Sequence, residues 1–264
     1  MTQMKEKIDI FYFSGTGNTK WVADHLDKRL HAGSIDSRCF AIENLDYDFS
    51  EFDSLAQVGL MFPIYSSYTP RLMQEFIRKL PRVNNLPLFI IQTAWLFGGH
   101  NAADTGLPLT EKGYKPYLFA NVFMPNNLNL PPFGWLPIRN GKQIQGKLKK
   151  AEKRISQLSR DIIERKNIEE GKSKLSRYFD RIQRKADLTD LARYYANDSC
   201  TGCGWCASNC PAGNIEMKDN RPVFGTSCMF CVRCYNRCPQ DAIQSRYNKT
   251  TSEGYARYKG PEVE

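Results

Sequence analysis

Eight cysteines near the end of the chain form a motif that occurs twice. Each copy has two CxxC steps, a CxxxC step and a proline directly after its fourth cysteine. This is the spacing of the bacterial [4Fe–4S] run, in which three thiolates wrap one cubane and the fourth cysteine ligates the neighbouring cluster. The motif therefore predicts two clusters. The predicted ligands are Cys200, Cys203, Cys206 and Cys238 for cluster 1, and Cys228, Cys231, Cys234 and Cys210 for cluster 2.

Zinc is the alternative metal, because paired CxxC steps also build sites of four thiolates. A zinc site explains neither the third cysteine of each copy nor the CxxxCP ending that both copies share. Gly202 and Gly204 allow the backbone to approach an inorganic cluster closely. Residues 215–224 predict a hairpin that turns at Asp219 and Asn220. Residues 197–245 resemble a bacterial two-cluster ferredoxin.

A second candidate site begins at residues 14–19, between an apolar run and a helical pattern. Backbone amides at the start of that helix, its dipole and three hydroxyl groups suit a phosphate. The loop lacks the lysine of a nucleotide-triphosphatase P-loop, and Lys20 stands where a Rossmann loop needs its third glycine. It therefore predicts a monophosphate site formed by Ser14, Gly15, Thr16, Gly17, Asn18 and Thr19.

The same loop resembles the T/S-x-T-G-N-T loop of flavodoxins, which holds the phosphate of FMN. The resemblance extends to the segments after the third and fourth predicted strands, where aromatic rings are expected to flank the isoalloxazine. The candidate residues there are Pro63, Ile64, Tyr65, Ser66 and Tyr68, with Thr93, Ala94, Trp95, Phe97, Gly98 and Gly99. Long flavodoxins often carry an acidic residue in the third loop, whereas residues 95–97 here are apolar, which favours full reduction of the flavin.

The elements that position these loops alternate between strand and helix. Near-continuous apolar runs predict parallel strands at residues 8–13, 38–42, 56–62, 88–92 and 117–124. Apolar residues at helical spacing predict helices after residue 19, at 70–80, at 144–162 and at 175–186. The alternation predicts an α/β fold, a doubly wound parallel sheet. Residues 126–139, rich in Pro, Asn and Gly, predict a surface loop that could cover a flavin.

The chain as a whole resembles the flavodoxin–ferredoxin fusion family, including the Met-Pro-Asn-Asn segment at 124–127. The resemblance implies a flavodoxin-like sheet of strand order 2-1-3-4-5 and a small α+β domain with two [4Fe–4S] clusters. The expected boundaries are an FMN-binding domain at 1–170, a helical connector at 171–196, a ferredoxin-like domain at 197–250 and a flexible tail at 251–264.

Charge and cysteine usage limit the partners and the compartment. An odd number of cysteines, nine, and the lack of an export signal disfavour a secreted disulfide scaffold, so a cytoplasmic protein is expected. No apolar run is long enough for a membrane span. Residues 139–198 hold 17 Lys and Arg against 9 Asp and Glu, which predicts docking of an acidic redox protein. No recognised nucleic-acid motif is present.

These features predict an electron carrier, in which clusters pass single electrons and FMN stores two. One alternative is an FMN-dependent reductase of a small molecule with the clusters as internal wiring. Another is a docking module of a larger redox complex with an idle flavin site. No catalytic side chain is predicted, and an anaerobic setting is expected because cubanes are sensitive to oxygen. Cys39 is expected to be a core residue, and His100 is a weak candidate donor to a substrate or flavin.

Overall fold

The computed structural model describes residues 6–43, 45–65, 68–99, 101–131, 133, 134, 136, 141–170, 193–247 and 250–261. The chain divides into two compact units. The first unit comprises Met1–Ser14, Asn18–Met124 and Gly146–Arg184, and the second comprises Gly15–Gly17, Pro125–Gln145 and Lys185–Glu264. Among the described residues, no helix has the length and apolar character needed to cross a membrane.

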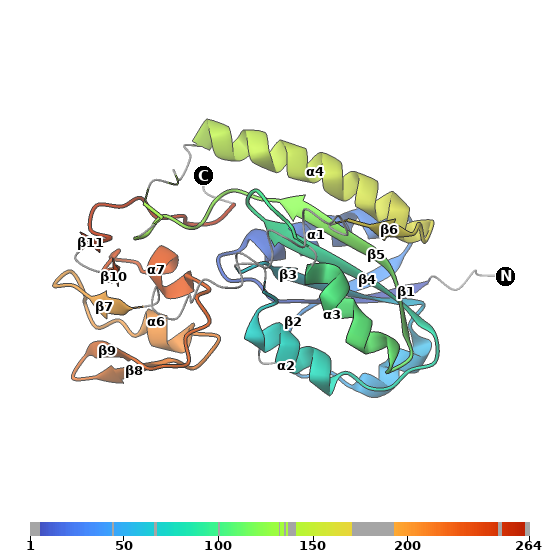
Figure 1. Ribbon diagram of the computed structural model, residues 1–264, viewed down its shortest axis with the longest axis horizontal. Coiled ribbons are helices and arrows are strands. Elements are labelled where there is room, and N and C mark those ends of the chain that lie inside the picture. The colour runs from blue at the N-terminus through green and yellow to red at the C-terminus, as the bar shows by residue number, and fades with distance from the viewer. Residues whose placement is uncertain are drawn as a thin grey trace. The chain divides into compact units, whose positions relative to one another are not determined.

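A parallel sheet of six strands forms the centre of the first unit. Its strand order is β2-β1-β3-β4-β5-β6 (Figure 1), which contains the predicted order 2-1-3-4-5 and adds a short edge strand. The strands are β1 (Lys7–Tyr12), β2 (Asp36–Ala41), β3 (Gln57–Pro63), β4 (Leu86–Ala94), β5 (Tyr114–Phe123) and β6 (Ile168–Glu169). The side chains of β3 and β4 are almost all buried, as expected for strands covered on both faces. The predicted fold class is confirmed.

Helices cover both faces of this sheet, with α1 and α4 on one face and α2 and α3 on the other (Figure 1). They are α1 (Asn18–Ala32), α2 (Arg71–Lys79), α3 (Asn101–Thr110) and α4 (Gly141–Ile163), and a 3-10 helix, η1, spans Phe49–Ser54. The apolar stripe predicted for 144–162 is the buried side of α4, since Leu148, Ile155 and Ile162 are buried. The strands and helices therefore leave the loops at the carboxyl edge of the sheet for binding.

One charged side chain lies inside the sheet. Asp9 of β1 is fully buried and accepts two hydrogen bonds from Arg38, from Nε at 2.9 Å and from the terminal guanidinium nitrogen at 2.7 Å. The hydroxyl of Tyr47 also donates to it. Arg38 is partly exposed and contacts Glu51 at 2.6 Å. The buried charge is thus paired and hydrogen-bonded, which is the condition under which a core tolerates it.

From residue 193 onward, the described part of the second unit is built of short elements. They are β7 (Tyr194–Ala196), α6 (Trp205–Ser208), β8 (Ile215–Lys218), β9 (Arg221–Phe224), α7 (Arg233–Arg237), β10 (Ile243–Tyr247) and β11 (Thr250–Thr251). Strands β8 and β9 pair antiparallel as the predicted hairpin, and its turn residues Asp219 and Asn220 both have positive φ. Strand β10 pairs antiparallel with β7 on one side and β11 on the other.

Two segments predicted to lie at the surface carry buried side chains. In the loop expected to cover a flavin, Leu130 is fully buried in the core of the second unit, and the carbonyl of Asn129 accepts a hydrogen bond from Tyr235 at 2.8 Å. In the tail expected to be flexible, Tyr258 is buried and its backbone N–H donates to Asn236 at 2.9 Å. Both segments belong to the second unit and contribute buried side chains to it.

Residues 171–192 of the predicted connector at 171–196 lie outside the described residues. Its last three residues form β7 rather than part of a helix.

Candidate cluster and flavin sites

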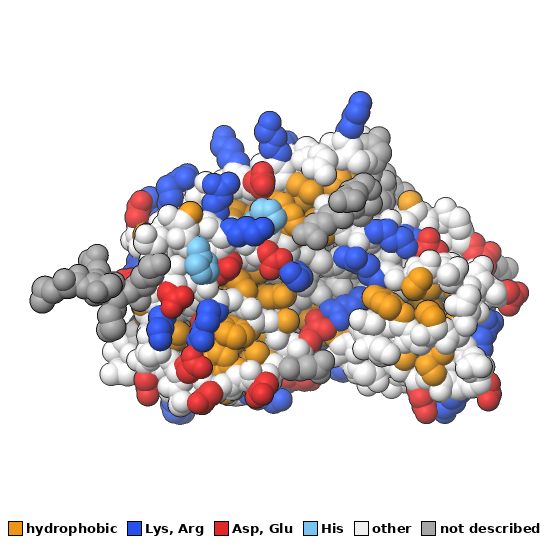
Figure 2. Space-filling view, turned by 180° about the vertical axis from the view of Figure 1, so that it is seen from behind, with side chains coloured by type: hydrophobic (Ala, Val, Ile, Leu, Met, Phe, Trp, Pro, Cys, Tyr) orange, Lys and Arg blue, Asp and Glu red, His pale blue; other side chains and the backbone are white. Residues whose placement is uncertain are grey.

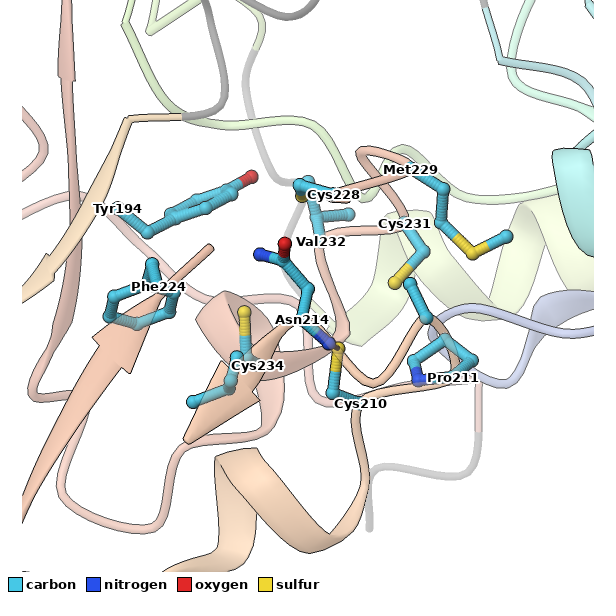
Figure 3. A pocket seen from close by; sticks show the side chains of 12 residues that line it. Tyr194, Cys210, Pro211, Asn214, Phe224, Cys228, Met229, Cys231, Val232 and Cys234 are labelled. Carbon is cyan, nitrogen blue, oxygen red and sulfur yellow. Dashed lines mark hydrogen bonds between the residues drawn. The ribbon is translucent and has the colours of Figure 1, made fainter. Parts of the chain in front are cut away.

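Two cavities in the second unit are lined by cysteines. Cavity 1 is lined by Cys200, Cys203, Cys206 and Cys238 among others. Cavity 2 is lined by Cys210, Cys228, Cys231 and Cys234 among others, which Figure 3 shows together with Tyr194 and Phe224. Each cavity thus takes three cysteines from one copy of the motif and the fourth from the other copy. This is the grouping that the spacing predicts.

Backbone N–H groups of the second unit point at cysteine sulfur. The amide of Asn214 donates to Cys210 Sγ at 3.3 Å, and that of Ala242 donates to Cys238 Sγ at 3.3 Å. Each of these two acceptors is the fourth cysteine of a copy, and each donor lies four residues further on. Amide donors to sulfur favour thiolate ligands and help set the potential of a cluster.

The backbone bends in the same way in both copies of the motif. Gly202 and Gly204 have φ values of 71° and 72°, and the equivalent residues of the second copy, Phe230 and Val232, have φ values of 56° and 52°. Side chains other than glycine rarely occupy this left-handed region, and a β-branched valine does so at a cost. The second copy therefore keeps the bend without the residue that would make it easy, which is typical of a functional loop.

Desolvation dominates the electrostatics of the cysteines. Burial raises the pKa of Cys231 to about 12, and it also raises the pKa of Cys206 and of Cys234. These thiols are protonated at neutral pH when no cluster is bound, so binding as thiolates must release protons. Within the described residues, no three His, Cys, Asp or Glu side chains converge to hold a single metal ion. The cysteines are spread around the two cavities instead.

The candidate flavin loops follow β1, β3 and β4 and are tied together at the carboxyl edge of the sheet. The hydroxyls of Thr19 and Thr93 lie 2.7 Å apart and form a buried hydrogen bond. The amide of Ile64 donates to the Thr93 carbonyl at 3.0 Å. Thr93 at the end of β4 therefore contacts the loop after β1 and the loop after β3, as the switch-point arrangement predicts.

The predicted aromatic side chains lie in the second and third loops. Tyr65 and Tyr68 pair through their backbones, with hydrogen bonds of 3.1 and 2.9 Å, and Ser66 between them lies outside the described residues. Tyr68 and Phe97 are exposed, at 41% and 36% of their surface. Trp95 is partly buried. The chain thus offers several aromatic rings at this edge of the sheet.

Glycines define the backbone of the first and third loops. Gly17 has a φ of 106°, which a side chain would strain. A Cβ atom added at Gly98 would lie 2.0 Å from Oδ1 of Asn121, so the third loop packs against β5 only with glycine there.

Lys147 of α4 contacts Trp95 of the third loop, which the sequence alone did not indicate. Its Nζ donates to the carbonyl of Trp95 at 2.7 Å and lies 5.8 Å from the centre of the Trp95 ring. In the sequence, Lys147 is one of several lysines on the helix, and nothing in its spacing distinguishes it. The structure gives it a role in holding the third loop.

Cys39 and His100 are the two remaining residues that the sequence analysis singled out. Cys39 is half-buried rather than a core residue; its thiol donates to the Ala23 carbonyl at 3.6 Å, and burial raises its pKa well above the usual value, which makes a reactive thiolate scarce. His100 lies outside the described residues.

Comparison with known proteins supports the assignment of the second unit. A family model described as a 4Fe-4S dicluster domain matches residues 199–243. No curated protein matches the chain.

Comparison with solved structures concerns the first unit. An archaeal flavodoxin is 12% identical, with a TM-score of 0.39, over 58% of this chain and 99% of that chain. A flavodoxin from Streptococcus pneumonia TIGR4 is 15% identical, with a TM-score of 0.41, over 59% and 99%. The two-electron reduced flavodoxin of Megasphaera elsdenii is 18% identical, with a TM-score of 0.40, over 56% and 98%. At such low similarity the strand order, and not this likeness, carries the assignment.

The chain therefore combines a sheet of flavodoxin strand order with a 4Fe-4S dicluster domain. This combination fits the flavodoxin–ferredoxin fusion that the sequence resembles.

Proposed function

We propose that this protein transfers electrons between two [4Fe–4S] clusters and FMN, and passes them to a redox partner. The observation that carries the proposal is the division of the eight motif cysteines into two cavities of four. A cubane takes four thiolates, so the donor sets fit two clusters with no cysteine of the motif left over. The match to a dicluster domain supports the same assignment.

FMN is the second cofactor of the proposal. When bound, FMN accepts electrons singly or in pairs, and so links one-electron carriers to two-electron chemistry. The protein's own contribution is binding: Asn18 and Thr19 are the first two residues of α1, and a phosphate is favoured at the N-terminus of a helix. The hydrogen bond between Thr19 and Thr93 fixes this loop against the third one.

An acidic protein is the partner that the charge distribution favours. Lys149, Lys150 and Lys153 of α4 are exposed, and Figure 2 shows lysine and arginine side chains projecting along the edge where α4 lies. Exchanging these three lysines for glutamine should slow reduction of an acidic partner, and the difference should vanish at high salt. Equal rates at low salt would remove this docking site. Lys147 is left unchanged because it contacts Trp95.

A reductase of a small molecule is the second candidate function. Leu96, 66% exposed, and Phe97 make the third loop an apolar surface that could receive a substrate beside a flavin.

Anaerobic purification with quantitation of iron, sulfide and flavin tests the proposal. We expect about eight iron and eight sulfide atoms and one FMN per chain, and stepwise reduction visible by absorbance and EPR. Iron without FMN, even after FMN is added back, would leave a two-cluster ferredoxin on an idle scaffold. Zinc without sulfide would refute the clusters. A small molecule that reoxidises the flavin with saturable kinetics would favour the reductase.

A further inference from the structure

The lining of cavity 2 includes a buried tyrosine hydroxyl. Tyr194 of β7 lines cavity 2 and is 8% exposed. Its hydroxyl is inaccessible to water and has no hydrogen-bond partner among the residues that the structure describes. In Figure 3 the ring lies along the cavity, with the hydroxyl on the side of Cys228. An unsatisfied hydroxyl in a core costs free energy, so each such group in a folded protein calls for an explanation.

The surroundings of Tyr194 give the fold no reason to use tyrosine instead of phenylalanine. The ring packs against Phe224, with centroids 6.0 Å apart, and against Tyr235 at 6.3 Å. These contacts require an aromatic ring and make no use of the hydroxyl. The remaining surroundings are the cavity itself, whose lining is apolar apart from its cysteines and Asn214. A bound cluster would bring sulfide and thiolate sulfur, which accept hydrogen bonds.

We propose that the Tyr194 hydroxyl donates a hydrogen bond to sulfur of the cluster in cavity 2 and raises the reduction potential of that cluster. This inference rests on the proposed function, because it requires a cluster bound by Cys210, Cys228, Cys231 and Cys234. A donor to sulfur stabilises the reduced cluster more than the oxidised one, since the reduced cluster carries one more negative charge. Tyr194 therefore distinguishes two clusters that the repeated motif makes look equivalent.

Cavity 1 has no corresponding buried hydroxyl. As far as the structure describes its lining, it contains no tyrosine; Thr201 and Gln240 are exposed to water, and Trp205, which carries an indole N–H donor, is partly buried. Taken alone, the Tyr194 hydrogen bond therefore gives the cluster in cavity 2 the higher potential. An electron that enters the second unit is then expected to rest on the cluster in cavity 2.

The test replaces the hydroxyl and leaves the ring. Tyr194→Phe is compared with Tyr195→Phe, a matched control on the same strand whose ring faces Arg246 at 4.9 Å. Both variants are made in the full chain, checked for iron content and titrated anaerobically with dithionite under EPR. Repeating the titration in a Cys203→Ala background, which removes a ligand of cavity 1, identifies the couple that belongs to cavity 2.

For Tyr194→Phe we expect one couple to move to lower potential and the other to stay. At a fixed potential the ratio of reduced to oxidised cluster should fall about tenfold, which is about 59 mV for a one-electron couple. The Tyr195 variant should leave both couples in place. A Tyr194 variant with full iron and unchanged potentials would overturn the inference, as would a shift of the couple that belongs to cavity 1.

A second variant keeps the test decisive where phenylalanine disturbs cluster assembly. A fluorinated tyrosine introduced only at position 194 has a more acidic hydroxyl and donates a stronger hydrogen bond, so the same couple should move to higher potential. An unchanged potential there would overturn the inference. A protein without any iron–sulfur cluster would instead refute the proposed function, so the two failures are distinguishable.

Discussion

The exchange of one cysteine between the two copies of the motif is the feature of the second unit that mutation can test most sharply. Cys210 belongs to the first copy by sequence, yet it lines cavity 2 with Cys228. Cys203, also from the first copy, lines cavity 1. Two arrangements are compared: crossed ligation, in which each cluster takes its fourth cysteine from the other copy of the motif, and local ligation, in which each copy wraps its own cluster. Pairs of alanine substitutions at these three positions give opposite results for the two arrangements.

The expected iron content of each double variant follows from the division of the eight cysteines into two sets of four. If ligation is crossed, Cys210→Ala with Cys228→Ala removes two ligands of one cluster, and about four iron atoms per chain remain. Cys210→Ala with Cys203→Ala removes one ligand from each cluster, and both assemblies are impaired. If each copy wrapped its own cluster, the two double variants would exchange these results.

The assay is anaerobic reconstitution followed by iron and sulfide quantitation, with EPR of the reduced protein. The magnetic interaction between two nearby reduced clusters should disappear in the Cys210 and Cys228 double variant, which leaves one intact cluster signal. An intact cluster in the Cys210 and Cys203 double variant, together with none in the other, would refute the crossed ligation and the assignment of one cluster to each cavity.

Three further predictions concern the first unit. Asp9→Asn should lower the free energy of unfolding in urea by about 3 kcal/mol, because it breaks an ion pair whose carboxylate is buried. The control Glu51→Gln removes an exposed partner of the same arginine and should lower it by less than about 1 kcal/mol. Equal losses of stability in the two variants would contradict this prediction. Lys147→Met should weaken FMN binding about 3- to 10-fold in a fluorescence titration, because one hydrogen bond to the third loop is lost. The control Lys149→Met removes the same charge and should leave the affinity for FMN unchanged. Burial raises the pKa of the Cys39 thiol, so the reactive thiolate is scarce near neutral pH. Iodoacetamide at pH 8 should therefore label Cys39 only after the protein is unfolded, as measured by peptide mapping. Rapid labelling of the folded protein would show that the thiol is accessible and ionised.

Much of the fold could be predicted because the strands are long apolar runs. The run at residues 8–13 corresponds to β1, and the amphipathic stripe at 144–162 corresponds to α4. Helix α3 (Asn101–Thr110) was not predicted, because Gly106 and Pro108 both disfavour a helix interior. In the structure a Cβ atom at Gly106 would lie 2.7 Å from the Phe119 ring, so close packing on β5 overrides local propensity.

The cluster ligands could be predicted since their information lies entirely in residue type and spacing. The flavin site was predictable only as three loops, because parallel strands bring their carboxyl ends to one edge whatever the loop residues are. The partners within that edge, such as Lys147 with Trp95, come from elements far apart in the sequence. The same holds for Tyr194: Tyr195 is its neighbour, and only the pleat of β7 decides which ring meets the cavity.

The two copies of the motif also show what the cysteine loops require of the chain. Glycine at 202 and 204 could be taken as a sequence preference of the first copy alone, because the second copy has Phe230 and Val232 instead. All four residues nevertheless have left-handed backbone. Local propensity would place a valine elsewhere, so the arrangement of the cysteines around a cavity must impose the bend on both copies. The second copy accepts this strain and gains two buried apolar side chains between its cysteines, Phe230 and Val232, of which Val232 lines cavity 2.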